Sequence, residues 1–378
     1  MKSKELQAKP MKKDLYNLCI NTLNKGKETI NYIVQNESIE KYVTPYFENN
    51  YSFAYGFSGI VYGLDTLKMK IPDRLLNKCY KDILNKGNIT SPYSLTRGKI
   101  PALMSINHYE PDKKLEIKIG ELLNVELMRS LSNETENFSL FNGLSGIGFL
   151  AIEMFKETHN TYFLSLAKMV YNQILKTKPI LDNFGLAYGN TGIALFLIHY
   201  AEIKKTKNAL KYAKFYILYD VKKGKIKNDS NRLRGIADKS GGSIPYIYIP
   251  YGTAGILKTI IKYLSLKRDR DLFSELLYLY NSLDIKSTLQ SGYLLGTAGV
   301  ISNLLDLDSI KINNKNVLVT LDTLLESLLS TRICKNDKVL FPADQNLFTA
   351  IDYGSGELGI LLTINKLVTK REFDPLFQ

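Results

Sequence analysis

Residues that could carry acid–base chemistry stand beside a recurrent glycine pattern. Four of them directly precede the first glycine of a G-x-x-G element, and two more lie shortly before its last copy. A tyrosine phenol can give a proton to an enolate, take it back, or donate a hydrogen bond to an oxyanion. The predicted catalytic residues are Tyr188, Tyr251, Asp352 and Tyr353. The predicted substrate-binding residues at these motifs are Tyr55 and Asn142. With 25 tyrosines in the chain, packing or the lining of a cavity is the alternative role.

Two loops supply further charged candidates for substrate binding. Asp182 lies on the segment that leads into the third copy of the glycine pattern, and Arg232, Arg234 and Asp238 lie in the segment NRLRGIADKSGGS before the fourth copy. A long loop rich in glycine and charge could form a lid or the edge of a peptide-binding site. An ordinary solvated loop is the alternative.

Metal ligands are scarce. The chain has three histidines and three cysteines, and no two of them have metal-ligand spacing. They are His108, His159, His199, Cys19, Cys79 and Cys334. We therefore predict neither a metal site nor a cofactor. The odd, widely spaced cysteines also argue against a disulfide framework and favour a reducing cytoplasm.

The glycine pattern itself recurs six times, each copy followed by Ile or Val. The first and second glycines are Gly56/Gly59, Gly143/Gly146, Gly189/Gly192, Gly252/Gly255, Gly296/Gly299 and Gly356/Gly359. One copy means little, but six copies spread over the chain indicate a repeated supersecondary unit. The longest interval, from Gly56 to Gly143, holds sequence around His108 that fits none of the copies.

The segments between the glycines predict helical hairpins. After Gly192 an apolar stretch, IALFLIHYAEI, is followed by a polar break and by the amphipathic segment ALKYAKFYILYDV. A helix that is apolar all round is buried, whereas an amphipathic one shows a face to water. We therefore predict an all-α fold with two concentric layers. The last apolar helix lacks an outer partner, which the N-terminal segment could supply, so a closed α/α toroid is favoured over an open solenoid. Its inner-helix N-termini would gather at one mouth that favours an anion.

Composition limits the partners. The chain has 378 residues, 45% of them hydrophobic, with 50 Lys+Arg against 37 Asp+Glu and a net charge of +13. This excess favours an acidic peptide, a nucleic acid or a membrane surface, although solvated lysines alone would also produce it. No apolar run approaches the roughly 20 residues that span a bilayer, and the basic start lacks a signal core. We expect a cytoplasmic protein.

On these motifs the sequence resembles the lanthionine synthetase C-like family, the LanC-type cyclases. The segments NGLSGI, AYGNTGI, PYGTAGI and LLGTAGV lie nearest to the family form, and the resemblance covers residues 14–370. It implies an α/α toroid that adds peptide cysteine thiols to dehydroalanine or dehydrobutyrine in a precursor peptide. It therefore selects a peptide as the partner, with no nucleic acid and no membrane.

The sequence departs from the family at its zinc site. The family's cysteine, cysteine and histidine ligands correspond here to Pro250, Leu294 and Leu295, whose side chains have no donor atom. The family's histidine before the third glycine motif is Tyr188, and its acidic residue before the second motif is Ser139. This pattern resembles the zinc-less cyclase domain of class III lanthipeptide synthetases. It makes Tyr188 the first choice of catalytic residue, with Tyr251 second.

The resemblance thus implies a zinc-independent cyclase that forms lanthionine or labionin rings. Residues 1–13 are expected to be a basic tail or linker remnant, and residues 14–378 a single cyclase domain. The kinase and lyase domains of a synthetase are further expected partners, because this chain carries no Walker-type G-x-x-x-x-G-K-[ST] motif and no H-R-D or D-F-G kinase set. One alternative is a non-catalytic module that binds the precursor peptide. Another is a toroidal glycosidase, for which Asp352 and Glu357 are available as carboxylates.

Overall fold

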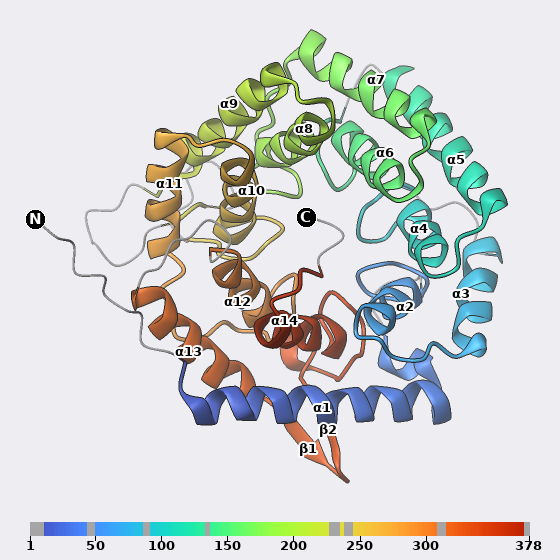
Figure 1. The fold of residues 1–378 in the computed structure, drawn as a ribbon, viewed down its shortest axis with the longest axis vertical. Coiled ribbons are helices and arrows are strands. Elements are labelled where there is room, and N and C mark those ends of the chain that lie inside the picture. Colours follow the sequence, from blue (N-terminus) through green and yellow to red (C-terminus); the bar gives the residue numbers. More distant parts are fainter. Residues whose placement is uncertain are drawn as a thin grey trace, which may run out of the picture.

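The polypeptide folds into two concentric layers of helices, as predicted (Figure 1). The computed structural model describes residues 11–43, 50–85, 91–132, 137–226, 235–237, 245–307 and 315–373. The inner helices of this part are α2 (Phe57–Thr66), α4 (Lys99–Tyr109), α6 (Leu144–Thr158), α8 (Asn190–Lys204), α10 (Thr253–Leu266), α12 (Thr297–Asp306) and α14 (Glu357–Thr369). The outer helices are α1 (Lys13–Asn36), α3 (Asp73–Asn85), α5 (Lys113–Ser132), α7 (Thr161–Thr177), α9 (Lys207–Gly224), α11 (Arg270–Asn281) and α13 (Lys315–Ser330). Inner and outer helices alternate along the chain.

Burial follows the hydrophobic pattern in both layers. In α8 every residue from Asn190 to Ala201 is buried, because neighbouring inner helices and α9 cover all its faces. The outer helix α11 buries one side only, through Leu272, Leu276, Leu279 and Tyr280. None of the described helices is both long enough and apolar enough to cross a bilayer.

The ring contains one more unit than the glycine pattern predicts. The helix α4 begins after Gly98 and divides the long interval between Gly56 and Gly143 nearly in half. Its second glycine is replaced by Pro101, which is tolerated because the first turn of a helix has no intrahelical partner for that N–H. The sequence around His108 is therefore an inner helix of the ordinary kind, and the expectation of six units was wrong.

The N-terminal helix closes the ring, as the unpaired last helix predicted. α1 lies against α14, and α14 also packs beside α2 and α12 (Figure 1). A Cβ added to Gly26 would stand 2.7 Å from Leu361, so α1 and α14 are in close contact there. The short hairpin of β1 (Ile333–Lys335) and β2 (Lys338–Leu340) fastens α1 from outside, with Val339 N donating to Thr29 Oγ1 at 2.9 Å. The 3-10 turns η1 (Ile39–Tyr42) and η3 (Asp344–Asn346) complete the described elements.

Each glycine motif folds the preceding loop back over the first turn of its inner helix. A Cβ on Gly59 would lie 1.8 Å from the carbonyl oxygen of Phe53, and one on Gly299 would lie 2.0 Å from that of Tyr293. Real Cβ atoms do not approach backbone so closely, so these positions require glycine. The second glycine of the motif is thus a packing requirement of the helix start.

This fold-back also satisfies the helix N-termini. The first N–H of α2, at Phe57, donates to Asn50 O at 2.6 Å, and that of α12, at Thr297, donates to Gln290 O at 2.9 Å. The starts of α6, α10 and α14 make the same bond to their own loops. The first N–H of each of these helices is therefore already paired and is not free to bind an anion at the mouth.

We predict that Gly59→Ala lowers the free energy of unfolding by about 2–3 kcal/mol, because the loop carbonyl of Phe53 must move away from the new methyl group. Gly120→Ala is the matched control. Its nearest neighbour is the ring of Tyr162, which is 43% exposed and can move, and alanine favours the helix by about 1 kcal/mol. Urea denaturation followed by circular dichroism measures both. Equal stability of Gly59→Ala and the wild-type protein would contradict the close contact.

Candidate functional site

The loops that carry the glycine motifs are joined to one another at one end of the ring. Each bond involves the residue two or three before a motif glycine and the corresponding residue of the next unit. The bonds are Ala54 N to Thr96 O (2.9 Å), Leu95 N to Phe141 O (3.2 Å), Phe141 N to Ala187 O (3.0 Å), Ala187 N to Pro250 O (2.6 Å), Leu294 N to Gly354 O (2.8 Å) and Gly354 N to Ala54 O (2.6 Å). Pro250 has no N–H, so it cannot donate the bond to Leu294. The predicted shared mouth therefore exists.

The residues directly before five of the first glycines form a band of polar side chains at this mouth, which we call the polar arc. Its members are Tyr55, Arg97, Asn142, Tyr188 and Tyr251. The Arg97 guanidinium lies 6.0 Å from the ring centroid of Tyr55, within cation–π range. Asn142 Nδ2 donates to Tyr188 OH at 3.2 Å, and the rings of Tyr188 and Tyr251 stack at 5.7 Å with an interplanar angle of 22°. Four of the six motif residues predicted from the sequence thus lie together.

Arg97 is the member of the polar arc that the sequence did not reveal. Its position before Gly98 was the available signal, but Pro101 hides the motif there. Arg97 adds an exposed positive charge next to Tyr55. It provides the polar arc with a cation in the absence of lysine or histidine.

Two phenols of the polar arc, those of Tyr55 and Tyr251, stay protonated at neutral pH. Burial raises the pKa of Tyr251 to about 12, with a smaller contribution from Tyr188. Burial also raises the pKa of Tyr55, and the nearby Asp352 carboxylate adds to the effect. Protonated phenols are hydrogen-bond donors, so these side chains are suited to stabilise negative charge on a substrate oxygen.

Asp352 and Tyr353 do not belong to the polar arc. The residue directly before Gly356 is Ser355, and Asp352 accepts from Ser355 N at 2.8 Å and from Gly356 N at 3.0 Å. Tyr353 is fully buried, with ring centroids 5.0 Å from Phe53 and 5.3 Å from Tyr293. The expectation that Tyr353 lines the same mouth was wrong in register, because Tyr353 occupies the position three residues before the glycine and is buried among aromatic rings. Asp352 lies near Tyr55, but its carboxylate is bound to its own motif loop.

The remaining predicted binding residues are not part of the arc. Asp182 is exposed on the loop before α8. Arg232, Arg234 and Asp238 lie outside the described residues.

A buried carboxylate on α9 positions the third motif. Asp220 accepts from Gly185 N at 3.2 Å, from Thr191 N at 2.7 Å and from Thr191 Oγ1 at 2.7 Å, and it also binds Asn190. Burial raises its pKa to about 6, although these hydrogen bonds oppose the shift. The bonds bracket Tyr188 and hold its loop against the outer layer. The signal missed in the sequence is an aspartate within the apolar run FYILYDV of α9.

The positions of the family's zinc ligands do not fit a metal. The side chains of Pro250, Leu294 and Leu295 offer no sulfur, nitrogen or oxygen donor. Among the residues that the structure describes, no three His, Cys, Asp or Glu side chains form a group that could hold a metal ion. Ser139, at the family's acidic position, is buried and its hydroxyl has no partner in the described chain.

The two carboxylates considered for a glycosidase point apart. Asp352 is bound to its own motif loop, whereas Glu357 Oε2 accepts from Phe341 N at 2.9 Å and Oε1 faces Gly26 of α1. A glycosidase needs both carboxylates at one substrate bond. Asp352 and Glu357 therefore do not form such a pair.

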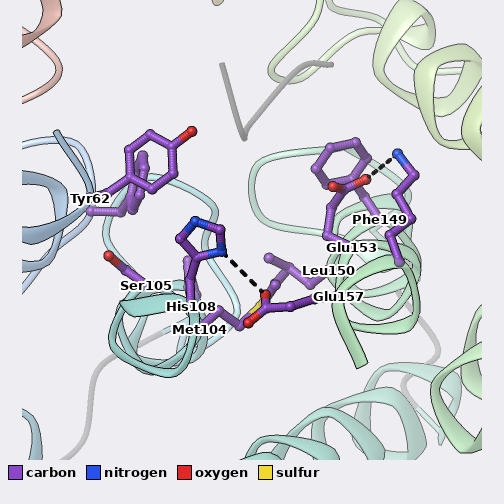
Figure 2. A pocket seen from close by; sticks show the side chains of 11 residues that line it. Tyr62, Met104, Ser105, His108, Phe149, Leu150, Glu153 and Glu157 are labelled. Carbon is purple, nitrogen blue, oxygen red and sulfur yellow. Dashed lines mark hydrogen bonds and ion pairs between the residues drawn. The ribbon is translucent and has the colours of Figure 1, made fainter. Parts of the chain in front are cut away.

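A cavity of about 330 Å³ lies between α2, α4 and α6 (Figure 2). His108 Nδ1 is 3.9 Å from Glu157 Oε2 across it, and His108 Nε2 is 3.7 Å from Asp65 Oδ2. Burial raises the pKa of Glu157, and His108 partly offsets the rise. Next to this group, His199 is buried, with Nδ1 2.9 Å from Lys156 Nζ.

Comparison with known proteins supports the fold. No protein-family model and no curated protein matches the sequence. The structure matches nisin cyclase with a TM-score of 0.65 and 16% sequence identity, over 97% of this chain and 98% of that one. The chain shares the fold of nisin cyclase. The resemblance to LanC-type cyclases seen in the motifs is thereby confirmed at the level of the fold.

Two toroidal hydrolases match less well. An alpha-1,6-mannanase from Salegentibacter sp. HEL1_6 has a TM-score of 0.46 and 12% identity, over 94% of this chain and 99% of that one. An unsaturated glucuronyl hydrolase from Streptococcus agalactiae has a TM-score of 0.48 and 11% identity over 100% of both chains. Both score well below nisin cyclase.

We predict that Glu357 makes the protein less stable as pH rises. Burial raises the pKa of Glu357 to about 8 in the folded state, from an ordinary value of 4.5. The folded state therefore keeps a proton that the unfolded chain has released. The stabilisation is complete below about pH 4.5 and is lost as pH rises through 8. Glu357→Gln, which stays neutral, should remove this loss.

Thermal unfolding between about pH 6.5 and 9 tests this, because Asp220 has already titrated by then. The wild-type Tm should fall across this range, and the Tm of Glu357→Gln should fall less. Parallel pH profiles of the two proteins would contradict the assignment.

Proposed function

We propose that this protein promotes the addition of cysteine thiols to dehydroalanine or dehydrobutyrine in a precursor peptide. The nisin cyclase fold and the polar arc support the proposal. The observation that carries it is the contact of Tyr188, at the family's histidine position, with Asn142 and Tyr251 at the common mouth of the motif loops. Hydrogen-bond donors at this mouth would suit a reaction that develops negative charge on a substrate oxygen.

The reaction needs charge stabilisation on one oxygen. The cysteine sulfur forms a bond to the β-carbon of the alkene while its electrons move to the amide oxygen, giving an enolate. The thiol's proton is released to solvent, and the α-carbon then takes up a proton. Tyr188 and Tyr251 would donate hydrogen bonds from their phenol O–H groups to the enolate oxygen. If the enolate attacks a second dehydroalanine before protonation, labionin forms instead.

Thiol activation in this proposal comes from positioning. A free cysteine with a pKa of about 8.5 is a few per cent thiolate near pH 7 and is intrinsically very nucleophilic. A peptide held with sulfur and alkene in contact gains the large effective molarity of an intramolecular reaction. We therefore propose zinc-independent catalysis, in the setting of a class III synthetase with kinase and lyase partners.

A second candidate is a module that binds the precursor peptide without catalysing ring formation. The apolar residues Pro250, Leu294 and Leu295 at the family's ligand positions favour it. The two candidates differ in the ring-forming rate, so one kinetic experiment separates them.

The test follows thioether formation by mass spectrometry in a synthetic peptide that holds one dehydroalanine and one cysteine. Tyr188→Phe should lower the rate on the order of 10²-fold, because it removes one donor to the enolate oxygen. Tyr162→Phe is the matched control, because Tyr162 lies on the outer helix α7 and is 43% exposed. It should react like the wild-type protein.

If Tyr188→Phe and Tyr251→Phe both form rings at the wild-type rate, these phenols have no role in catalysis. A rate no greater than that of the peptide alone, with binding retained, would establish the peptide-binding module instead.

A further inference from the structure

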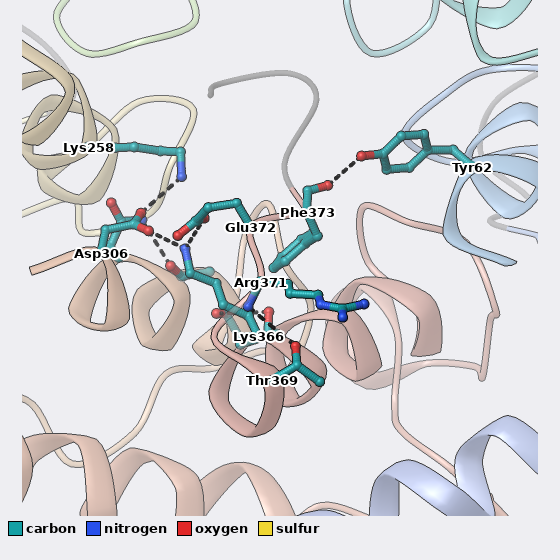
Figure 3. Close-up of polar contacts among 12 residues, drawn as sticks. Tyr62, Lys258, Asp306, Lys366, Thr369, Arg371, Glu372 and Phe373 are labelled. Carbon is teal, nitrogen blue, oxygen red and sulfur yellow. Dashed lines mark hydrogen bonds and ion pairs between the residues drawn. The ribbon is translucent and has the colours of Figure 1, made fainter. Parts of the chain in front are cut away.

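The chain returns into the ring after its last inner helix. α14 ends at Thr369, Lys370 adopts a left-handed conformation with φ 58°, and residues 371–373 then run inward (Figure 3). Glu372 is fixed by Lys366 Nζ at 2.6 Å. Lys366 also pairs with Asp306, which Lys258 contacts from α10 at 3.0 Å. Two lysines thus share one aspartate, and Glu372 supplies the second negative charge.

Phe373 ends this segment in a group of aromatic side chains, which we call the aromatic nest: Phe53, Tyr62, Tyr293 and Tyr353. Phe373 is 2% exposed, and its ring centroid lies 5.3 Å from that of Tyr293 and 6.5 Å from that of Tyr353. Tyr62 OH donates to the carbonyl oxygen of Phe373 at 2.6 Å (Figure 3). One side chain and one backbone carbonyl are therefore held together, as in the recognition of a peptide.

The aromatic nest includes residues of the motif loops, which carry the polar arc, and residues that line the cavity. Phe53, Tyr293 and Tyr353 each lie three residues before a motif glycine, two residues from the position that the polar arc uses. Phe53 and Tyr62 also line the cavity of about 330 Å³ (Figure 2). The nest thus lies beside both the motif loops and the cavity.

We propose that the aromatic nest and the Lys258–Asp306–Lys366 group form a binding site for an extended peptide in which an acidic residue directly precedes an aromatic one. In the free chain Glu372 and Phe373 occupy this site in its place. The proposal rests on the proposed function in taking a peptide as the substrate. The positive net charge of +13 also favours an acidic peptide.

The binding of the tail is therefore a competition. An incoming peptide displaces residues 371–373, so their removal should raise its apparent affinity without changing its contacts. Burial alone would raise the pKa of Asp306, but Lys258 and Lys366 hold this pKa below its ordinary value. The Lys258–Asp306–Lys366 group therefore stays charged at neutral pH.

A fluorescein-labelled peptide with the sequence of residues 370–378, KREFDPLFQ, tests the proposal by fluorescence anisotropy. It should bind a chain that ends at Lys370 at least tenfold more tightly than the full chain, because the full chain's own tail competes. The labelled peptide with alanine for Phe373, and one of scrambled sequence, are the matched controls and should bind at least tenfold more weakly. Tyr62→Phe in the shortened chain should weaken binding about fivefold through the lost hydrogen bond.

Full-length Phe373→Ala, which keeps the rest of the tail, is the second variant if the shortened chain does not fold. It should also bind the labelled peptide more tightly than the wild-type chain. If either variant folds by circular dichroism but does not bind the peptide, or if both unfold, Phe373 is a core residue and the proposal is wrong. Anisotropy requires no ring formation, so peptide binding without thioether formation would contradict the proposed function alone.

Discussion

The contact between a loop carbonyl and the second glycine of each motif is the constraint on which the rest of the structure depends. It presses the loop onto the first turn of an inner helix, as at Gly59 and Gly299. Because the loops are held there, their backbone groups can bond from one unit to the next. The same contact fixes the residue before the first glycine at the mouth, and so brings side chains from distant parts of the chain together. The polar arc is a consequence of helix packing.

The chemistry at the mouth follows from which side chains this geometry presents. In place of thiolate and imidazole ligands the chain presents phenols, an amide and a guanidinium. Such groups stabilise negative charge by hydrogen bonding and do not generate a nucleophile. In our proposal the thiol is therefore made reactive by the way the peptide is held next to the alkene. A peptide must therefore be held near the polar arc. The aromatic nest already holds one segment of chain, because Phe373 packs in it and Tyr62 donates to the Phe373 carbonyl.

Much of this arrangement follows from the sequence, and the exceptions have physical reasons. The glycine spacing and the apolar helices predicted the toroid, its closure by the N-terminal helix and the gathering of Tyr55, Asn142, Tyr188 and Tyr251. The unit that contains Arg97 was missed because a proline can replace a glycine in the first helical turn. Tyr353 was placed in the wrong register because motif residues were counted by proximity to the glycine.

Contacts between residues far apart in the chain could not be predicted from local sequence patterns. Asp220 reaches the third motif from the outer layer, and Phe373 crosses from the end of the chain to Tyr62 on the first inner helix. Nothing in the periodicity of either segment specifies its partner.

The central claim is that this mouth accelerates thiol addition without zinc. The most direct test is the ring-forming rate of a peptide that holds dehydroalanine and cysteine, measured after exhaustive chelation of the protein. Our account predicts a rate well above that of the peptide alone, unchanged by chelation and by added zinc; a rate that chelation abolishes and zinc restores would contradict it.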